Sequence, residues 1–322
     1  MHFTLPATRF PQFNSRWDVG YHSSLADLIR NNVTAAIYQA ATDGGTLELR
    51  GGSIDELAEA YIASAREAAA RRDFLPLLRV RHCIVGPDGE ISSFGSGIEA
   101  EAIHKALDRF LSESARYCTA VDEDRLSLGI SVPMSMRFGV TSAWLDDLWV
   151  FGAMLSLSLI CGHGIGNISP ALIQYCLNQC NLESLTPSVI SSWHPSLDRA
   201  ACQLQAVGFG GNLTPFQDRI LPALVDRNQN MHNLLVRQVI HTGAIGPEIH
   251  GHVETVPFAE GVELPCSNGF SFGKQFAHSF PGVLSFSLHT TGPLRLRLSR
   301  TSHAYYCALT VRSCFTIRFS RM

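Results

Sequence analysis

Residues 147–177, DLWVFGAMLSLSLICGHGIGNISPALIQYCL, decide the fold of this chain more than any other stretch. The run from Leu148 to Cys161 has the length of a helix, is largely apolar and holds no charged residue. Glycines at positions 162, 164 and 166 interrupt it, and Ser169-Pro170 then opens a second apolar segment. An apolar helix, a glycine-rich break and a helix that begins at Ser-Pro predict a pair of buried helices.

The apolar run is short for a membrane-spanning helix. A span needs about 20 apolar residues, whereas Leu148–Cys161 holds 14 and an extension brings in His163 and further glycines. We therefore expect a buried core helix and no membrane span.

Composition limits the function classes. The chain has 322 residues, 46% of them hydrophobic and only 16% charged, with a net charge of −3. The length suits one large or two ordinary domains, and the low charge content predicts a surface that needs a partner. Nothing in the charge balance favours nucleic acid or an anionic membrane surface as a partner.

Nine cysteines at irregular spacing favour reduced thiols over a disulfide framework. The N-terminal sequence MHFTLPATRFPQF lacks the basic flank and apolar core of a signal peptide. We expect a cytoplasmic or nuclear protein.

Local patterns predict an α+β fold that is mostly helical. Ser53-Ile-Asp-Glu56 is a capping box, and its helix should run to about Arg72. We further expect strands at 46–50 and 77–85, an amphipathic helix at 99–117, helical pieces over 182–207 broken by Pro187 and Pro195, a helix at 223–240, a loop at 243–257, and a turn with a short strand at 267–273.

The last part of the chain has a different composition. Residues 264–322 contain no aspartate or glutamate, but they contain Lys274 and six arginines. Two interpretations stay open. The end is either not a regular domain terminus, through truncation or a misread coding frame, or it is a basic interaction tail.

Several residue groups resemble chemical sites without matching their spacing. Cys176, Cys180, His194 and Cys202 have the residue types of a zinc site but fit no common finger, and buried free cysteines are the better interpretation. His250-x-His252 has no ligand partner at a matching distance. Asp146 and Asp147 are expected in the first turn of the apolar helix, where they complement its dipole. We expect no metal and no cofactor.

Cys314 is the one candidate nucleophile. Arg312 and Arg318 flank it, and nearby cations lower the pKa of a thiol.

Three segments together resemble the HECT-type ubiquitin ligase domain, in the divergent form found in mushroom-forming fungi. Residues 94–111, FGSGIEAEAIHKALDRFL, resemble the early large-lobe motif, although Glu101-Ala102 replaces its Gly-Gly pair. Residues 149–164 with Ile168–Ile173 resemble the apolar large-lobe helix and the helix after it, and FAEGVELP at 258–265 resembles the "F-x-x-G-F…LP" segment. The resemblance covers about Asp73 to Pro281.

The small lobe is the weakest part of the resemblance. Residues 288–296, LHTTGPLRL, and Ser313-Cys314-Phe315-Thr316 resemble the "F-V-T-G-x-x-R-L-P" strand and the "T-C-F-N" active-site element at a shorter interval than usual. The resemblance implies a helical extension at 1–72, a large lobe at 73–281 and a truncated or irregular C-terminal lobe at 282–322.

The resemblance also implies a reaction. Cys314 would accept ubiquitin from a ubiquitin-conjugating enzyme as a thioester and pass it to a lysine of a protein substrate, without a metal or cofactor. An apolar groove of the large lobe would hold the conjugating enzyme. Two alternatives stay open: a large-lobe remnant that binds proteins without catalysis, and a small protein anchored to a membrane by Leu148–Cys161.

Overall fold

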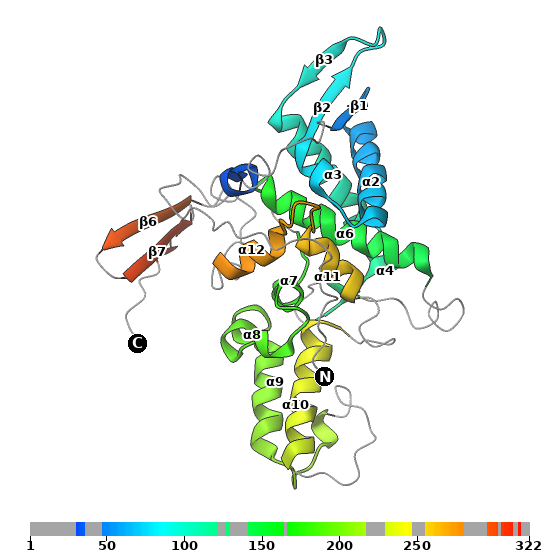
Figure 1. The fold of residues 1–322 in the computed structure, drawn as a ribbon. Coiled ribbons are helices and arrows are strands. Elements are labelled where there is room, and N and C mark those ends of the chain that lie inside the picture. The colour runs from blue at the N-terminus through cyan, green and yellow to red at the C-terminus, as the bar shows by residue number, and fades with distance from the viewer. Residues whose placement is uncertain are drawn as a thin grey trace. The chain divides into compact units, whose positions relative to one another are not determined.

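The computed structural model describes residues 30–35, 47–121, 126–128, 141–163, 166–216, 229–246, 255–279, 295–301, 304–311 and 315–316. Most of these residues are helical, and the described strands form three small sheets (Figure 1). The predicted class, α+β and mostly helical, is confirmed.

Contacts between Cα atoms divide the chain into two compact units. The first unit comprises Met1–Ala7, Phe110–Leu148 and Asn167–Ala259, and the second comprises Thr8–Arg109, Trp149–Gly166 and Glu260–Met322. The sequence-based division at residues 72 and 281 remains a prediction.

The second unit contains a three-stranded sheet. Strand β1 (Leu47–Gly51) pairs in parallel with β2 (Val80–Val85), which pairs antiparallel with β3 (Ile91–Phe94). Helix α2 (Ile54–Arg71) connects the two parallel strands, as a parallel pair requires. Residues 75–79 form a 3₁₀ helix with Pro76 in its first turn, so the predicted strand begins at Val80 and not at residue 77.

The predicted capping box is confirmed. The side chain of Ser53 accepts a hydrogen bond from the backbone N–H of Glu56 at 3.2 Å, and Oε2 of Glu56 accepts one from Gly52 at 2.8 Å. The helix ends at Arg72, which adopts the left-handed conformation with φ 54°. The helix predicted at 99–117 begins earlier and has two pieces, α3 (Ser96–Ser112) and α4 (Ser114–Tyr117).

Helix α6 (Ser142–Ile160) begins six residues before the predicted apolar run. Every residue from Asp147 to Ile160 is buried, which is expected of a helix that is apolar all round. The helix is long and apolar enough to cross a membrane by length and composition, but 78% of its most apolar window is buried inside the protein. The prediction of a buried helix is confirmed. Gly162 follows it with φ 82°, a conformation that glycine adopts without strain.

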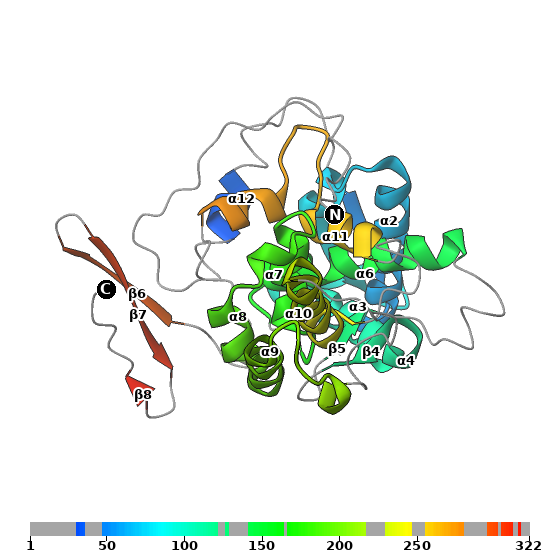
Figure 2. The ribbon, with the colours of Figure 1, turned by 90° about the horizontal axis from the view of Figure 1, so that it is seen from below.

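Three helices of the first unit begin at a proline, namely α7, α8 and α9. Proline is favoured at the first helical position because the backbone N–H that it lacks has no partner within the helix there. A two-stranded antiparallel sheet, β4 and β5, accompanies these helices. Helices α9 and α10 lie side by side in both views (Figures 1 and 2). The elements are α4, β4 (Cys118–Ala120), β5 (Leu126–Leu128), α7 (Pro170–Leu177), η3 (Leu182–Ser184), α8 (Pro187–Trp193), α9 (Pro195–Val207), η4 (Thr214–Phe216) and α10 (Gln229–Ala244).

Two predictions near residue 260 are wrong. Helix α11 (Thr255–Glu263) begins within the predicted loop. Helix α12 (Phe272–Ser279) replaces the expected short strand, and only Ser271 makes a β-bridge, to Pro265. The alternation of Phe270 and Phe272 with small residues imitates a strand, but both rings are buried where the chain enters a helix.

The acid-free tail contains a separate antiparallel sheet of β6 (Arg295–Thr301), β7 (Ala304–Val311) and β8 (Phe315–Thr316). Residues 280–294, which include most of the strand-like segment 288–296, and Cys314 lie outside the described residues.

Candidate functional site

Helices α11 and α6 touch through their backbones in the second unit. A Cβ atom at Gly261 would lie 2.1 Å from the carbonyl oxygen of Trp149 and 3.0 Å from the nitrogen of Ala153. One turn further along, Oγ of Ser156 donates a hydrogen bond of 2.7 Å to the carbonyl oxygen of Val262. The glycine of the "F-x-x-G" segment is therefore required by a close approach of two helices.

The chain leaving α6 also contacts α3 in the same unit. The ring of His163 forms a hydrogen bond with the backbone of Ala100 and stacks on the ring of His104, with centroids 5.0 Å apart and an interplanar angle of 21°. His104 and Ala100 belong to the first of the three segments identified in the sequence, and His163 to the second. The second segment thus contacts both of the other two within this unit.

Trp149, which Gly261 contacts, is the centre of an aromatic and charged cluster. Phe74 meets its ring edge-on at 5.8 Å and 86°, and the guanidinium carbon of Arg72 lies 5.5 Å from its centroid. Arg72 is 3.9 Å from Glu260. Burial raises the pKa of the Glu260 carboxyl, and the Arg72 cation offsets part of this effect.

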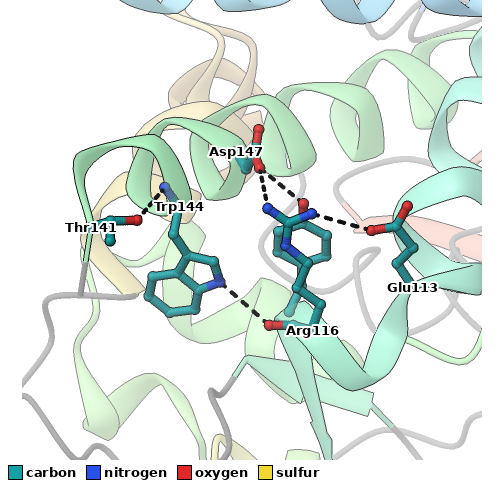
Figure 3. Close-up of polar contacts among 6 residues, drawn as sticks. Glu113, Arg116, Thr141, Trp144 and Asp147 are labelled. Atoms are coloured by element: carbon teal, nitrogen blue, oxygen red, sulfur yellow. Dashed lines mark hydrogen bonds and ion pairs between the residues drawn. The ribbon is translucent and has the colours of Figure 1, made fainter. Parts of the chain in front are cut away.

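In the first unit, a polar network surrounds Asp147 (Figure 3). Its buried carboxylate accepts a hydrogen bond of 2.9 Å from the hydroxyl group of Tyr117, and Nη2 of Arg116 lies 3.5 Å away. Arg116 also bonds Glu113 at 3.5 Å, and its carbonyl oxygen accepts a bond of 3.3 Å from Nε1 of Trp144.

The position predicted for the acidic pair is therefore wrong. Asp146 and Asp147 lie past the first turn of α6, which contains no acidic residue. The sequence analysis missed the function of Asp147 as a buried acceptor. A carboxylate next to an uncharged apolar run was the signal, because such a group needs partners when it is buried.

Burial disfavours the thiolate form of three described cysteines. It raises the pKa of Cys118 and of Cys161 to about 12, and it raises the pKa of Cys266 well above its usual value. Cys176 and Cys180 are buried, as predicted, and Cys202 is exposed on α9. Cys314, the predicted nucleophile, lies outside the described residues.

The suspected metal ligands are not brought together. Nε2 of His194 lies 3.0 Å from Oγ of Ser169, both fully buried, whereas Cys202 faces solvent. Across the described ranges, no three histidine, cysteine, aspartate or glutamate side chains are placed to hold a metal ion. His250 and His252 lie outside these ranges.

Two large apolar side chains are exposed near one end of the α9–α10 pair. Nε2 of His232 pairs with the carbonyl oxygen of Leu204 at 2.9 Å, so the C-terminal end of α9 meets the N-terminal end of α10. Phe209 follows α9 closely and is 51% exposed, and Leu234, two residues after His232, is 56% exposed. We call Phe209 and Leu234 the hairpin-end surface.

These features define the class: a mostly helical α+β protein built around one buried apolar helix. No protein-family model matches the chain, and no curated protein matches it.

Proposed function

We propose that this chain is a HECT-like ubiquitin-protein transferase. The observation that supports the proposal is that the second family-like segment contacts both of the others. Gly261 of the third segment contacts the α6 backbone, and His163 of the second contacts α3 of the first. Segments far apart in sequence but joined in space are expected of motifs that belong to one ancestral domain.

The proposed chemistry is covalent catalysis at Cys314. The thiolate attacks the thioester carbonyl that joins ubiquitin to the conjugating enzyme, and the thiol of that enzyme leaves. A substrate lysine amine then attacks the new thioester, an amide bond forms, and the Cys314 thiol is released. Division into two acyl transfers lowers each barrier.

The hairpin-end surface is the proposed docking site for the conjugating enzyme. Exposed aromatic and leucine side chains act as anchors when a partner buries them. Phe209 and Leu234 lie on elements that the His232–Leu204 contact holds together, so both are exposed near the same end of the α9–α10 pair.

A thioester assay tests the activity. Conjugating enzyme charged with ubiquitin is mixed with the full chain, and we expect a ubiquitin adduct that disappears on reduction. Cys314→Ser should abolish the reducible adduct, whereas the matched control Cys202→Ser, which removes an exposed thiol, should retain it. A reducible adduct that persists in Cys314→Ser would assign the nucleophile to another cysteine.

A protein-binding module without catalysis is the second candidate. The upward-shifted pKa values of Cys118, Cys161 and Cys266 favour it, because thiols of this kind are poor nucleophiles at neutral pH. Binding of the conjugating enzyme without any adduct would identify this function.

A further inference from the structure

His104 and His163 form a stacked pair that joins two elements of the second unit. His104 belongs to α3, and His163 lies just after α6. Nε2 of His163 is buried and has no hydrogen-bond partner within the described part of the chain. A proton added at this nitrogen would therefore create a buried N–H group without an acceptor, which is costly.

The charges around the pair also oppose protonation of His163. Arg30 lies close enough for its Nη2 to bond the carbonyl oxygen of Cys161 at 3.2 Å. Asp108 lies 3.5 Å from Nε2 of His104, but both side chains are about half exposed and solvent screens this pair. Glu99, also on α3, interacts with Arg30. A cation at His163 would thus meet the Arg30 cation.

We propose that the His104–His163 stack is a pH-sensitive latch, which holds the chain after α6 against α3 while the rings are neutral and releases it when they are protonated. Burial is the main cause that lowers the pKa of His163, and the His104 cation adds to it. The folded state thus binds fewer protons at His163 than the open state does. Acidification below the ordinary histidine pKa of about 6.5 consequently favours opening.

The segment that would open is defined by three backbone hydrogen bonds. The N–H groups of Cys161, Gly162 and His163 donate to carbonyl oxygens of α6 at 3.0, 3.0 and 2.9 Å. Gly162 within the segment has φ 82°, and as a glycine it can adopt a new backbone conformation with little strain. The latch is independent of the proposed transferase activity.

Hydrogen exchange of the full chain tests the latch. Protection factors, corrected for intrinsic exchange, are measured at about pH 7.5 and about pH 5.5, which bracket the ordinary histidine pKa. We expect the amides of residues 161–163 to lose severalfold in protection at the lower pH, while the middle of α6 stays protected. Equal protection of residues 161–163 at both pH values would overturn the proposal.

Two variants locate the effect. His163→Gln removes the partly buried ring whose titration drives the release and should abolish most of the pH dependence at residues 161–163. His241→Gln removes a histidine that packs edge-on against Tyr175 in the first unit, and it should leave the dependence intact. Equal effects of the two variants would contradict the latch.

Titration of the His163 ring in the unmodified protein tests the proposal without any variant, and so does not depend on whether a variant folds. The His163 ring resonance should titrate below pH 6.5. A midpoint at or above the ordinary histidine value would overturn the proposal.

Discussion

The hydroxyl group of Tyr117 lies 2.9 Å from Oδ2 of Asp147 and donates a hydrogen bond to a carboxylate whose residue is only 7% exposed. Arg116 approaches the same oxygen at 3.5 Å from a largely exposed position. The tyrosine is therefore the stronger partner, since solvent screens the arginine. Burial, and after it this hydrogen bond, raises the pKa of Tyr117, so the phenol remains a donor at all physiological pH values.

Tyr117→Phe should destabilise the protein by about 2 kcal/mol, because it removes a hydrogen bond to a buried charge and leaves the carboxylate short of a donor. Urea unfolding measures the loss. Addition of Asp147→Asn completes a double-mutant cycle, in which we expect a coupling energy above about 0.5 kcal/mol. Additive effects would show that the two side chains do not stabilise one another.

Gly261→Ala should be strongly destabilising. Its Cβ would lie 2.1 Å from the Trp149 carbonyl oxygen, so α11 and α6 must separate, and forced overpacking costs about 1–3 kcal/mol or more. Gly97→Ala is the matched control, because a Cβ at this other helical glycine meets no atom within 4 Å. It should be neutral or stabilise by up to about 1 kcal/mol. Similar thermal unfolding of the two variants would contradict the close helix contact.

Glu263 should make stability depend on pH. Burial raises the pKa of its carboxyl, and Lys274 at 3.5 Å offsets part of this effect from a position that is 41% exposed. The folded state therefore holds the proton to higher pH than the unfolded state, whose pKa is about 4.3. The resulting stabilisation is complete below that value and is lost as pH rises through the folded pKa.

Glu263→Gln removes this titration. At neutral pH we expect the variant to be more stable than the original protein by on the order of 1 kcal/mol, with a difference that disappears near pH 4. Chemical unfolding across this pH range measures the difference. A variant that is less stable at neutral pH would show that the ion pair with Lys274 outweighs the cost of burying the carboxylate.

Local chemistry explains which elements the sequence could predict. The Ser53 side chain accepts a hydrogen bond from the Glu56 N–H, and the Glu56 side chain accepts one from the Gly52 N–H. Local residues alone therefore specify the start of α2. The charge-free run of α6 likewise needs burial on all sides, wherever its partners come from.

The missed features depend on contacts between distant residues. The adjacent acids Asp146 and Asp147 favour a helix start, but α6 begins at Ser142 and Asp147 bonds Tyr117, 30 residues away. Phe272 begins a helix although its neighbours alternate as in a strand, since burial of its ring overrides local pattern. Position 261 requires glycine because the α6 backbone lies against it, and this contact joins residues more than 100 positions apart.

Replacement of Phe209 and Leu234 by serine should weaken binding of the conjugating enzyme. Truncation of a buried interface anchor costs about 2 kcal/mol or more, which corresponds to a loss of affinity of more than about tenfold. Titration calorimetry with the uncharged conjugating enzyme measures this loss without reference to catalysis. Since both side chains are more than half exposed, the double variant should unfold at nearly the same temperature as the original protein.

Phe94→Ser is the matched control for this surface, because Phe94 is 66% exposed but belongs to β3 in the second unit. It removes as much exposed aromatic surface and should leave the affinity unchanged. Loss of binding in Phe94→Ser alone would move the docking site to the β2–β3 strands. Equal affinity of the original protein and both variants for the conjugating enzyme would show that these exposed apolar side chains do not bind it. This outcome does not depend on whether Cys314 carries ubiquitin.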